Sequence, residues 1–445
     1  MGAASELLGL LDADDRHEIA LGDVRAKQIE AANELFHEKV KAIRLLANRA
    51  EEGGITEIRS LADLVPLLFA HTTYKSYPEA WFAEGKWDRM GKWLDTVSTN
   101  RVEGVDCSGV SDVDDWIERL ADKGHFMACS SGTTGKISMI NASAHDREMV
   151  RRITARSFQW ATGLAPQKDR LIFTLNPRGN NYRNIDTSGA LMDAFAAPDG
   201  DCRFTAQITI GEVSRMVALR RRIADGTAQP EEISAFEATS AEREKLLDDA
   251  VAQAAEGLAA HRDRKVLIIG QFPLNYRVSE AIRAMGLDAK DFHPDNALTV
   301  GGGLKGTVLP DNYREYVFGT LNIDPGHVYH MYAMQEVNTH MPRCHTGRYH
   351  VPPWLIFLPL DRNGEALIEP QQGEFECRAG FFDLAIDGRW GGVITGDRVY
   401  VDYGDCACGR PGPTINPDIV RYKDLPGGDY ITCAGTIDAY VRGVA

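Results

Sequence analysis

The sequence contains no apolar run that approaches the ~18–20 residues needed to cross a bilayer. Its first residues, MGAASELLGLLDADD, place no basic leader before an apolar stretch, so they predict no secretory signal. Cysteine is sparse, with eight residues in 445, too few for a disulfide framework in a chain of this length. Together these absences exclude a disulfide scaffold and predict a cytoplasmic protein without a membrane partner.

Basic residues are also in deficit. The 49 Lys and Arg residues face 64 Asp and Glu residues, which gives a formal charge of −15. A surface of this sign repels phosphate backbones and anionic lipid, so we expect no nucleic-acid partner. Apolar residues (44%) and charged residues (25%) occur at the levels of an ordinary globular protein. At roughly 100–200 residues per domain, the length predicts two to four domains, or a large body with a satellite.

The apolar pattern indicates an α/β protein. Apolar residues recur every three or four positions over 25–52 and predict a helix that Gly53-Gly54 ends. A second helix is predicted over 231–260, after Pro230. The apolar runs 171–175 and 266–269 predict strands, and the second is continuous enough to be buried on both faces. Alternation of such helices and strands favours a parallel sheet.

The pattern changes from about residue 350, where short β-rich runs dominate. The segment WLIFLPLDRNGEALIE predicts a hairpin around Asn363-Gly364, because Asn-Gly favours a tight turn. GEFECRAGFF and GGVITGDRVYVDY predict further strands. The tail therefore reads as a smaller, mainly β subdomain.

The densest chemical signal is a run of hydroxyl residues and glycines that ends in lysine: Ser130, Ser131, Gly132, Thr133, Thr134, Gly135 and Lys136. Glycine lets the backbone approach a ligand, while hydroxyls, backbone N–H groups and a lysine can donate to phosphate oxygens. The run differs from a Walker loop, because two residues separate its glycines and Ile137 follows the lysine. We interpret it as a phosphate loop; the alternative is a flexible polar turn.

This run resembles the phosphate-binding signature of the adenylate-forming superfamily, which includes acyl- and aryl-CoA synthetases, nonribosomal-peptide adenylation domains and firefly luciferase. Ile137-Ser138 stands where many members have Pro-Lys. The resemblance implies the large N-terminal domain of these enzymes, with layered α/β subdomains and a smaller β subdomain. It also implies that ATP and Mg²⁺ bind, with Thr133, Lys136 and Glu336 as catalytic residues.

A glycine-rich turn follows a predicted strand at Gly301, Gly302 and Gly303. In the superfamily such a turn lies against the adenine ring. An alternative reading is a dinucleotide fingerprint formed by Gly301, Gly303 and Gly306, although no helix clearly begins at the third glycine.

Two further motifs follow in the order of the superfamily. Tyr332-Ala333-Met334-Gln335-Glu336 is similar to its Tyr-Gly-x-Thr-Glu segment, in which the tyrosine stacks on adenine and the glutamate reaches Mg²⁺. Ala333 and Gln335 depart from that pattern, and a core tyrosine with a surface glutamate is the alternative. In Thr395-Gly396-Asp397 the resemblance implies that the aspartate accepts hydrogen bonds from both ribose hydroxyls.

Cys406-Ala407-Cys408-Gly409-Arg410 looks like the phenylacetate–CoA ligase branch, which carries Cys-x-Cys-Gly-Arg at this place. Cys344 and His350 lie in a stretch that resembles the same branch. Three thiols and an imidazole predict a structural Cys3His zinc site, because four protein ligands leave no position for a reactive water. His340 and His345 are alternative nitrogen ligands, and four unligated residues remain the other interpretation.

Near the end, Gly435–Gly443 is similar to the hinge motif of the superfamily, with Asp438 as the hinge residue. Thr436 replaces an arginine that touches ribose there, and Arg421 and Arg410 are the candidates to compensate. Full-length relatives continue with a mobile C-terminal domain, so we expect either a shortened form, a two-protein arrangement or a short enzyme like the acyl-protein synthetases. The predicted organisation is a helical region (1–60), an AMP-binding core (61–345), a β subdomain with the zinc clip (346–434) and a hinge remnant (435–445).

The predicted activity is attack of a small-molecule carboxylate on ATP, which gives an acyl-adenylate and pyrophosphate, followed by transfer to CoA or a protein cysteine. A substrate pocket is expected partly within 175–190, where Arg178 and Arg183 either pair with a polar acid or are surface charges. His71–Pro78 loosely resembles an entry segment of the branch, and Lys75 there is expected to be a structural or surface residue rather than a catalytic one. The alternative function is a nucleotide-binding partner or regulatory homologue of a separate subunit. A homodimer is compatible with the sequence.

Overall fold

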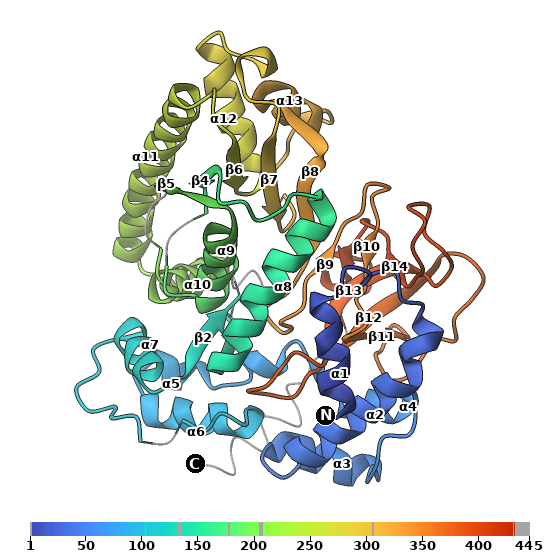
Figure 1. Ribbon diagram of the computed structural model, residues 1–445. Helices are drawn as coiled ribbons and strands as arrows, with labels where there is room; N and C mark the ends of the chain where they lie inside the picture. Colours follow the sequence, from blue (N-terminus) through green and yellow to red (C-terminus); the bar gives the residue numbers. More distant parts are fainter. Residues whose placement is uncertain are drawn as a thin grey trace. The chain divides into compact units, whose positions relative to one another are not determined.

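The computed structural model describes residues 2–102, 104–130, 136–176, 179–203, 208–304, 307–429 and 431. Contacts divide the chain into two compact units. Unit 1 comprises residues 1–130, 138–153 and 334–445, and unit 2 comprises residues 131–137 and 154–333. Figure 1 follows both along the sequence.

Unit 2 is built on a parallel sheet with the strand order β5-β4-β6-β7-β8. Its strands are β4 (Arg170–Thr174), β5 (Ala196–Arg203), β6 (Val266–Ile269), β7 (Asn296–Gly301) and β8 (Ile323–Tyr332). Its helices are α9 (Tyr182–Phe195), α10 (Ile210–Ala224), α11 (Pro230–Ala260), α12 (Phe272–Ala284) and α13 (Tyr313–Leu321), with the 3-10 turn η4 (Ala289–Asp291). The predicted parallel sheet is confirmed.

Helices cover both faces of this sheet. Alternate residues of each strand point to opposite faces, so each strand contacts helices on both sides. Phe173 and Ile268 pack with α11, α12 and α13 on one face, and Ile172 and Leu267 pack with α9 and the end of α8 on the other (Figure 1). The strand β6 is buried throughout, as its apolar run predicts. The helix predicted after Pro230 is confirmed as α11, which has that proline in its first turn.

Unit 1 joins segments from both ends of the chain. Its strands are β1 (Phe69–Ala70), β2 (Phe126–Cys129), β3 (Met139–Ala142), β9 (Met341–Pro342), β10 (Tyr349–His350), β11 (Leu355–Leu360), β12 (Phe375–Asp383), β13 (Gly392–Asp402), β14 (Thr414–Ile415) and β15 (Val420–Arg421). Its helices are α1 (Ala3–Gly9), α2 (Leu21–Lys39), α3 (Arg44–Gly53), α4 (Leu61–Leu64), α5 (Glu79–Ala83), α6 (Trp87–Val97), α7 (Val113–Asp122) and the first part of α8 (Ala144–Thr162), with the 3-10 turns η1 (Leu10–Asp12), η2 (Val65–Leu67), η3 (Thr73–Lys75) and η5 (Tyr422–Asp424).

The main sheet of unit 1 has the order β10-β14-β13-β12-β11, and both β1 and β15 pair with β13. The strand β1 is parallel to β13, with Phe69 opposite Val393. The predicted β-rich tail is therefore confirmed, and it incorporates a strand from residues 69–70.

Two local predictions are corrected. The continuous helix expected over 25–52 is wrong, because α2 ends at Lys39 and α3 begins at Arg44. The Lys39 ammonium is buried and donates to the carbonyls of Ile386, Asp387 and Arg389, which fixes the end of α2. The backbone adopts an extended conformation at Ile43, between the two helices. Ile43 is apolar and fully buried, so the helical sequence pattern continues through the break. The predicted stop is confirmed, since Gly54 adopts a left-handed conformation after α3.

The turn predicted around Asn363-Gly364 is present, with Gly364 at a φ of 74°. The run that follows the turn makes only an isolated bridge, between Leu360 and Leu367. The antiparallel partner of β11 is β12 instead. The expected hairpin is therefore present only as a tight turn, and the strands β11 and β12 that pair here are joined by a longer connection.

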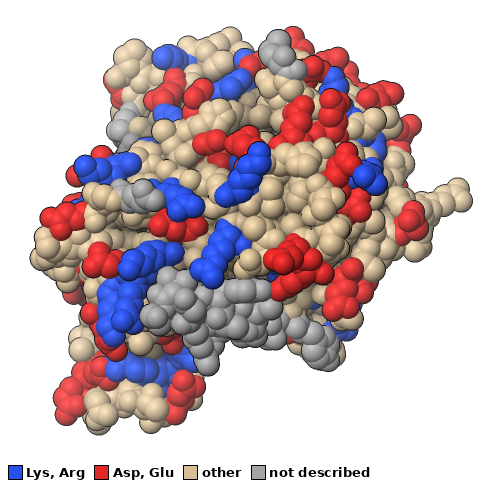
Figure 2. Space-filling model, turned by 90° about the horizontal axis from the view of Figure 1, so that it is seen from below, with Lys and Arg blue, Asp and Glu red and all other residues tan. Residues whose placement is uncertain are grey.

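The charged side chains are mixed over the face shown in Figure 2, where Lys and Arg lie among Asp and Glu. Among the described residues, no helix combines the length and the apolar character that crossing a membrane requires.

Candidate functional site

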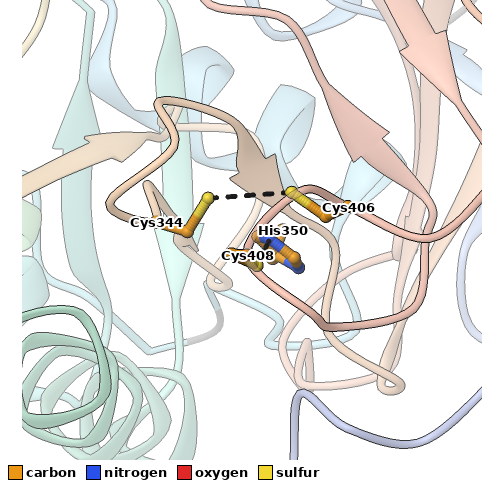
Figure 3. A group of neighbouring side chains, drawn as sticks. All are labelled: Cys344, His350, Cys406 and Cys408. Carbon is orange, nitrogen blue, oxygen red and sulfur yellow. Dashed lines mark hydrogen bonds between the residues drawn. The ribbon is translucent and has the colours of Figure 1, made fainter.

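The structure brings the four predicted metal ligands together in unit 1. Their ligand atoms all lie within 4.8 Å of one another: Cys344, His350, Cys406 and Cys408. The Sγ atoms of Cys344 and Cys406 are 3.9 Å apart, and Cys408 Sγ is 3.4 Å from His350 Nε2 (Figure 3). A tetrahedral zinc ion with Zn–S of about 2.3 Å and Zn–N of about 2.0–2.1 Å separates such atoms by roughly 3.8 Å and 3.6 Å. The donor set and its spacing therefore fit zinc.

Two cysteine turns of the same kind build this cluster. In one, Gly347 N–H donates to Cys344 O and Cys344 N–H donates to Arg348 O. In the other, Gly409 N–H donates to Cys406 O and Cys406 N–H donates to Arg410 O. Both glycines have positive φ, 93° and 88°, which a side chain would strain. The repeated turn sets each cysteine at the tip of a tight loop, as metal-binding loops require.

His350 supplies the nitrogen of the cluster because the short strand β10 pairs with β14, directly beyond the second cysteine turn. The alternative ligands His340 and His345 are not in the group that the described residues form. His340 is buried elsewhere, whereas His345 is exposed on the first turn.

The electrostatics of the cluster favour a thiolate. Burial alone would raise the pKa of Cys344, but hydrogen bonds from His350 and Thr346 outweigh it and lower that pKa to about 5. The Thr346 hydroxyl lies 3.1 Å from Cys344 Sγ and 3.4 Å from Cys406 Sγ. Burial raises the pKa of Cys408, and the Arg410 side chain partly offsets this effect through a hydrogen bond. In the structure, Arg410 therefore interacts with the cysteine cluster.

Glu336 lies in a loop that buried polar groups hold in place. Arg389 donates to the Glu336 carbonyl oxygen at 3.2 Å, and the Asp383 carboxylate accepts from the N–H groups of Asn338 and Thr339 at 2.7 and 2.8 Å. The Glu336 side chain is partly exposed. Loss of water raises the pKa of its carboxyl group, although Lys75 and Arg421 act in the opposite direction. A carboxylate held in this way can offer a hard oxygen ligand to Mg²⁺.

Asp397 lies on β13, and its partner across the strand pair is Arg421 of β15. The Arg421 Nε atom is 3.3 Å from Asp397 Oδ1. Of the two arginines considered as substitutes for the hinge arginine, Arg421 is therefore the one beside Asp397. The hinge segment with Thr436 and Asp438 lies outside the described residues.

The phosphate loop is described only at its ends. Ser130 N–H donates to Ser138 Oγ, and Ser138 N–H donates to Ser130 Oγ, each at 3.0 Å. This reciprocal pair closes the base of the loop between β2 and β3. Ser131 to Gly135 lie outside the described residues, and Lys136 is partly exposed. The predicted contacts of Thr133 thus remain a prediction.

In unit 2, the glycine turn and Tyr332 meet at one edge of the sheet. The strands β7 and β8 are parallel, and Gly301 is opposite Met331, next to Tyr332. Gly302 has a φ of 75°, so the turn needs glycine there. In open parallel sheets ligands bind at this carboxyl edge. After the turn, the next described helix, α13, begins only at Tyr313, which does not match the dinucleotide fingerprint.

Of the two arginines expected near the substrate, Arg183 is buried in the first turn of α9, so it is not a surface charge. Arg178 lies outside the described residues.

One polar segment near the candidate site was not predicted from the sequence to take part in it. His71–Lys75, between β1 and α5, lies beside Glu336 and the Asp397 strand: His71 N–H donates to Ile394 O at 2.9 Å, and Lys75 interacts electrostatically with Glu336. The feature of the sequence that could have indicated it is the polar stretch HTTYKS, which directly follows the apolar stretch VPLLFA. Its position depends on the pairing of β1 with β13, which no local pattern reveals.

No protein-family model matches the sequence, and no curated protein matches it significantly. The structure is similar to two solved structures of 2-hydroxyisobutyryl-CoA ligase. One, an open conformation in complex with 2-HIB-AMP and CoA, is 12% identical over 92% of this chain and 77% of the ligase chain, with a TM-score of 0.53. The other, in the postadenylation state with R3-HIB-AMP, is 11% identical over 91% and 70%, with a TM-score of 0.55. At such identities the likeness concerns the fold, and the predicted α/β fold of the adenylate-forming ligases is confirmed.

Proposed function

We propose that this protein is an adenylate-forming ligase that activates a small-molecule carboxylic acid with ATP and transfers the acyl group to a thiol. The observation that carries the proposal is the arrangement in unit 2: Tyr332 and Gly301–Gly303 lie at the carboxyl edge of a parallel sheet, within a fold shared with a CoA ligase solved with an acyl-AMP. The fold alone does not assign an activity, so the ordered motifs are the second support.

In the proposed reaction a substrate carboxylate oxygen attacks the α-phosphorus of ATP, and the bond to pyrophosphate breaks. Such chemistry needs positioning and charge neutralisation more than acid–base groups. Tyr332 and the glycine turn would seat the base, and Asp397 would accept from the ribose hydroxyls. The loop from Ser130 to Lys136 would donate to the phosphates. Mg²⁺ bound at Glu336 would neutralise phosphate charge when present.

The acyl acceptor is proposed to be CoA. The solved ligase in its open conformation contains CoA together with 2-HIB-AMP. A cysteine of an acceptor protein is the alternative, and the two are distinguished by offering each thiol to the preformed acyl-adenylate. The Cys-x-Cys-Gly-Arg motif supports a place in the phenylacetate–CoA ligase branch.

We also propose that Cys344, His350, Cys406 and Cys408 hold a structural zinc ion. The support is the fit of donor types and separations described above. Bound there, zinc would join the turn between β9 and β10, which follows the Glu336 loop, to the β13–β14 connection. Its contribution would be to the stability of unit 1.

The proposed activity is tested by exchange of labelled pyrophosphate into ATP, measured with a panel of aryl, fatty and short hydroxy acids. We expect exchange that depends on one class of acid and on Mg²⁺. Tight ATP binding without exchange for any acid would instead support the nucleotide-binding partner, the alternative function.

Replacement of Asp397 by asparagine is expected to lower kcat/KM for ATP by ~10–100-fold, or about 1.4–2.7 kcal/mol, because an amide accepts ribose hydroxyls less strongly than a carboxylate. The matched control is Asp418→Asn, an exposed aspartate paired with Arg398 at 3.3 Å. Pyrophosphate exchange at varied ATP concentration checks the expectation. Equal kinetics for both variants would contradict the role assigned to Asp397.

A further inference from the structure

The segment His71–Lys75 carries three successive polar side chains with buried atoms that have no hydrogen-bond partner among the residues that the structure describes. These atoms are His71 Nδ1, Thr72 Oγ1 and Thr73 Oγ1. Thr73 is fully buried, whereas His71 and Thr72 are partly exposed. A buried donor or acceptor without a partner costs about 1–3 kcal/mol, and native proteins contain few of them. Three in a row therefore indicate groups that another molecule satisfies.

The segment lies beside Asp397 and Glu336, the residues predicted to bind ribose and Mg²⁺. A Cβ atom on Gly396 would lie 3.1 Å from His71 Cε1, so the imidazole packs directly against the strand residue before Asp397. Lys75 is attracted by Glu336 and repelled by Arg421 and Lys423. The segment thus lies where the proposed ligand binds in unit 1.

The backbone of the segment is firmly fixed, so its side chains are preorganised. The strand β1 pairs with β13 immediately before His71. Tyr74 is buried, and its hydroxyl feels the charge of Arg389, the same arginine that donates to the Glu336 carbonyl. A cation and hydroxyls on a fixed backbone beside carboxylates are suited to an anion that arrives with a metal ion.

We propose that Thr72, Thr73 and Lys75 bind the phosphate groups of the nucleotide: the two hydroxyls donate to phosphate oxygens, and the ammonium neutralises their charge. This inference rests on the proposed function, because it assigns additional phosphate contacts to the same site. It differs from the sequence-based expectation that Lys75 is a structural or surface residue.

The test measures binding by the full chain, apart from catalysis. Dissociation constants for ATP and for adenosine are determined by calorimetry for wild type, Lys75→Met and Thr73→Val. We expect Lys75→Met to weaken ATP binding about tenfold and to leave adenosine binding unchanged, since adenosine has no phosphate. Lys92→Met, an exposed lysine of α6 in the same unit, is the matched control and should bind both ligands as wild type does.

Thr73→Val separates a ligand contact from a structural role. Valine keeps the shape and removes the hydroxyl, which has no partner among the described residues, so its loss should carry no cost in melting temperature. We expect an equal or higher melting temperature together with several-fold weaker ATP binding. A lower melting temperature with normal ATP binding would overturn the proposal in favour of a structural hydroxyl.

The remaining outcomes are distinct. If wild type binds ATP and catalyses exchange but Lys75→Met does so equally well, the inference fails and the proposed function stands. If wild type binds neither ATP nor adenosine, the proposed function fails and the inference fails with it.

Discussion

Cys406→Ser is expected to remove zinc from the protein and to lower its melting temperature by roughly 10 °C. The serine oxygen cannot replace a thiolate ligand, and the metal joins two loops that are otherwise tied by short strands of two residues each, β10 and β14. Structural zinc contributes binding free energy directly to folding. At about 2–4 °C per kcal/mol for a unit of 150–250 residues, the expected drop corresponds to a few kcal/mol.

Metal analysis and thermal unfolding check this expectation together. The matched control is Cys107→Ser, a partly buried cysteine of the same unit outside the cluster, which should retain one zinc per chain. Treatment of wild type with a chelator should reproduce the lower melting temperature. Purified wild type that carries no stoichiometric metal, and that melts at the same temperature with chelator, would contradict the zinc site.

Asp146→Ala is expected to destabilise unit 1 by about 3–5 kcal/mol, the usual cost of removing one partner of a buried ion pair. Asp146 is fully buried and accepts hydrogen bonds from the N–H groups of Ser143, Asp387 and Gly388 and from the side-chain amide of Asn338. Its loss would also leave the buried Arg389 guanidinium, 3.7 Å away, without its carboxylate.

The pH dependence of this effect has a definite sign. Burial would raise the pKa of Asp146, but the Arg389 charge and the hydrogen bonds outweigh it and lower that pKa below its usual value. A lowered pKa means that the carboxylate stabilises the fold at pH values above about 3.9, the value in an unfolded chain. This contribution is lost as the pH falls through the lower value in the folded protein.

Denaturant unfolding of wild type and variant from pH 7 down to pH 3 checks both parts. The difference in unfolding free energy should be large at pH 7 and should begin to shrink below about pH 4. Asp418→Ala, at an exposed ion pair, should change the unfolding free energy little at either pH. A constant difference across the range would exclude the ionised carboxylate as the stabilising species.

The sequence predicts elements best where local pattern and tertiary environment agree. The helix after Pro230 has a strong start signal, and the β6 run is apolar because both faces are buried, so both were predicted with nearly correct bounds. The break between α2 and α3 was missed because its cause, the contacts of Lys39 with carbonyls beyond residue 385, lies far away in the sequence.

In the candidate site, too, residues linked by local spacing could be predicted, and residues linked by tertiary pairing could not. Cys-x-Cys with an upstream cysteine and histidine is a spacing that the sequence displays, and the structure brings those four residues together. The His71–Lys75 segment has no such spacing, because its relation to Glu336 and Asp397 arises from strand pairing between Phe69 and Val393. Residues that share a site through a sheet register cannot be recognised from composition.

That pairing also bears on how the chain folds as it is made. The body of unit 2, residues 154–333, is nearly continuous, so it can begin to fold while later residues are still being synthesised. The strand β1 is translated early, yet its partner β13 is among the last segments to be translated. The β1–β13 pairing can therefore form only after most of the polypeptide exists, and Phe69 and Ala70 lack this partner until then. Chains interrupted before residue 392 would lack β13, and we expect them to depend on chaperones or to be degraded.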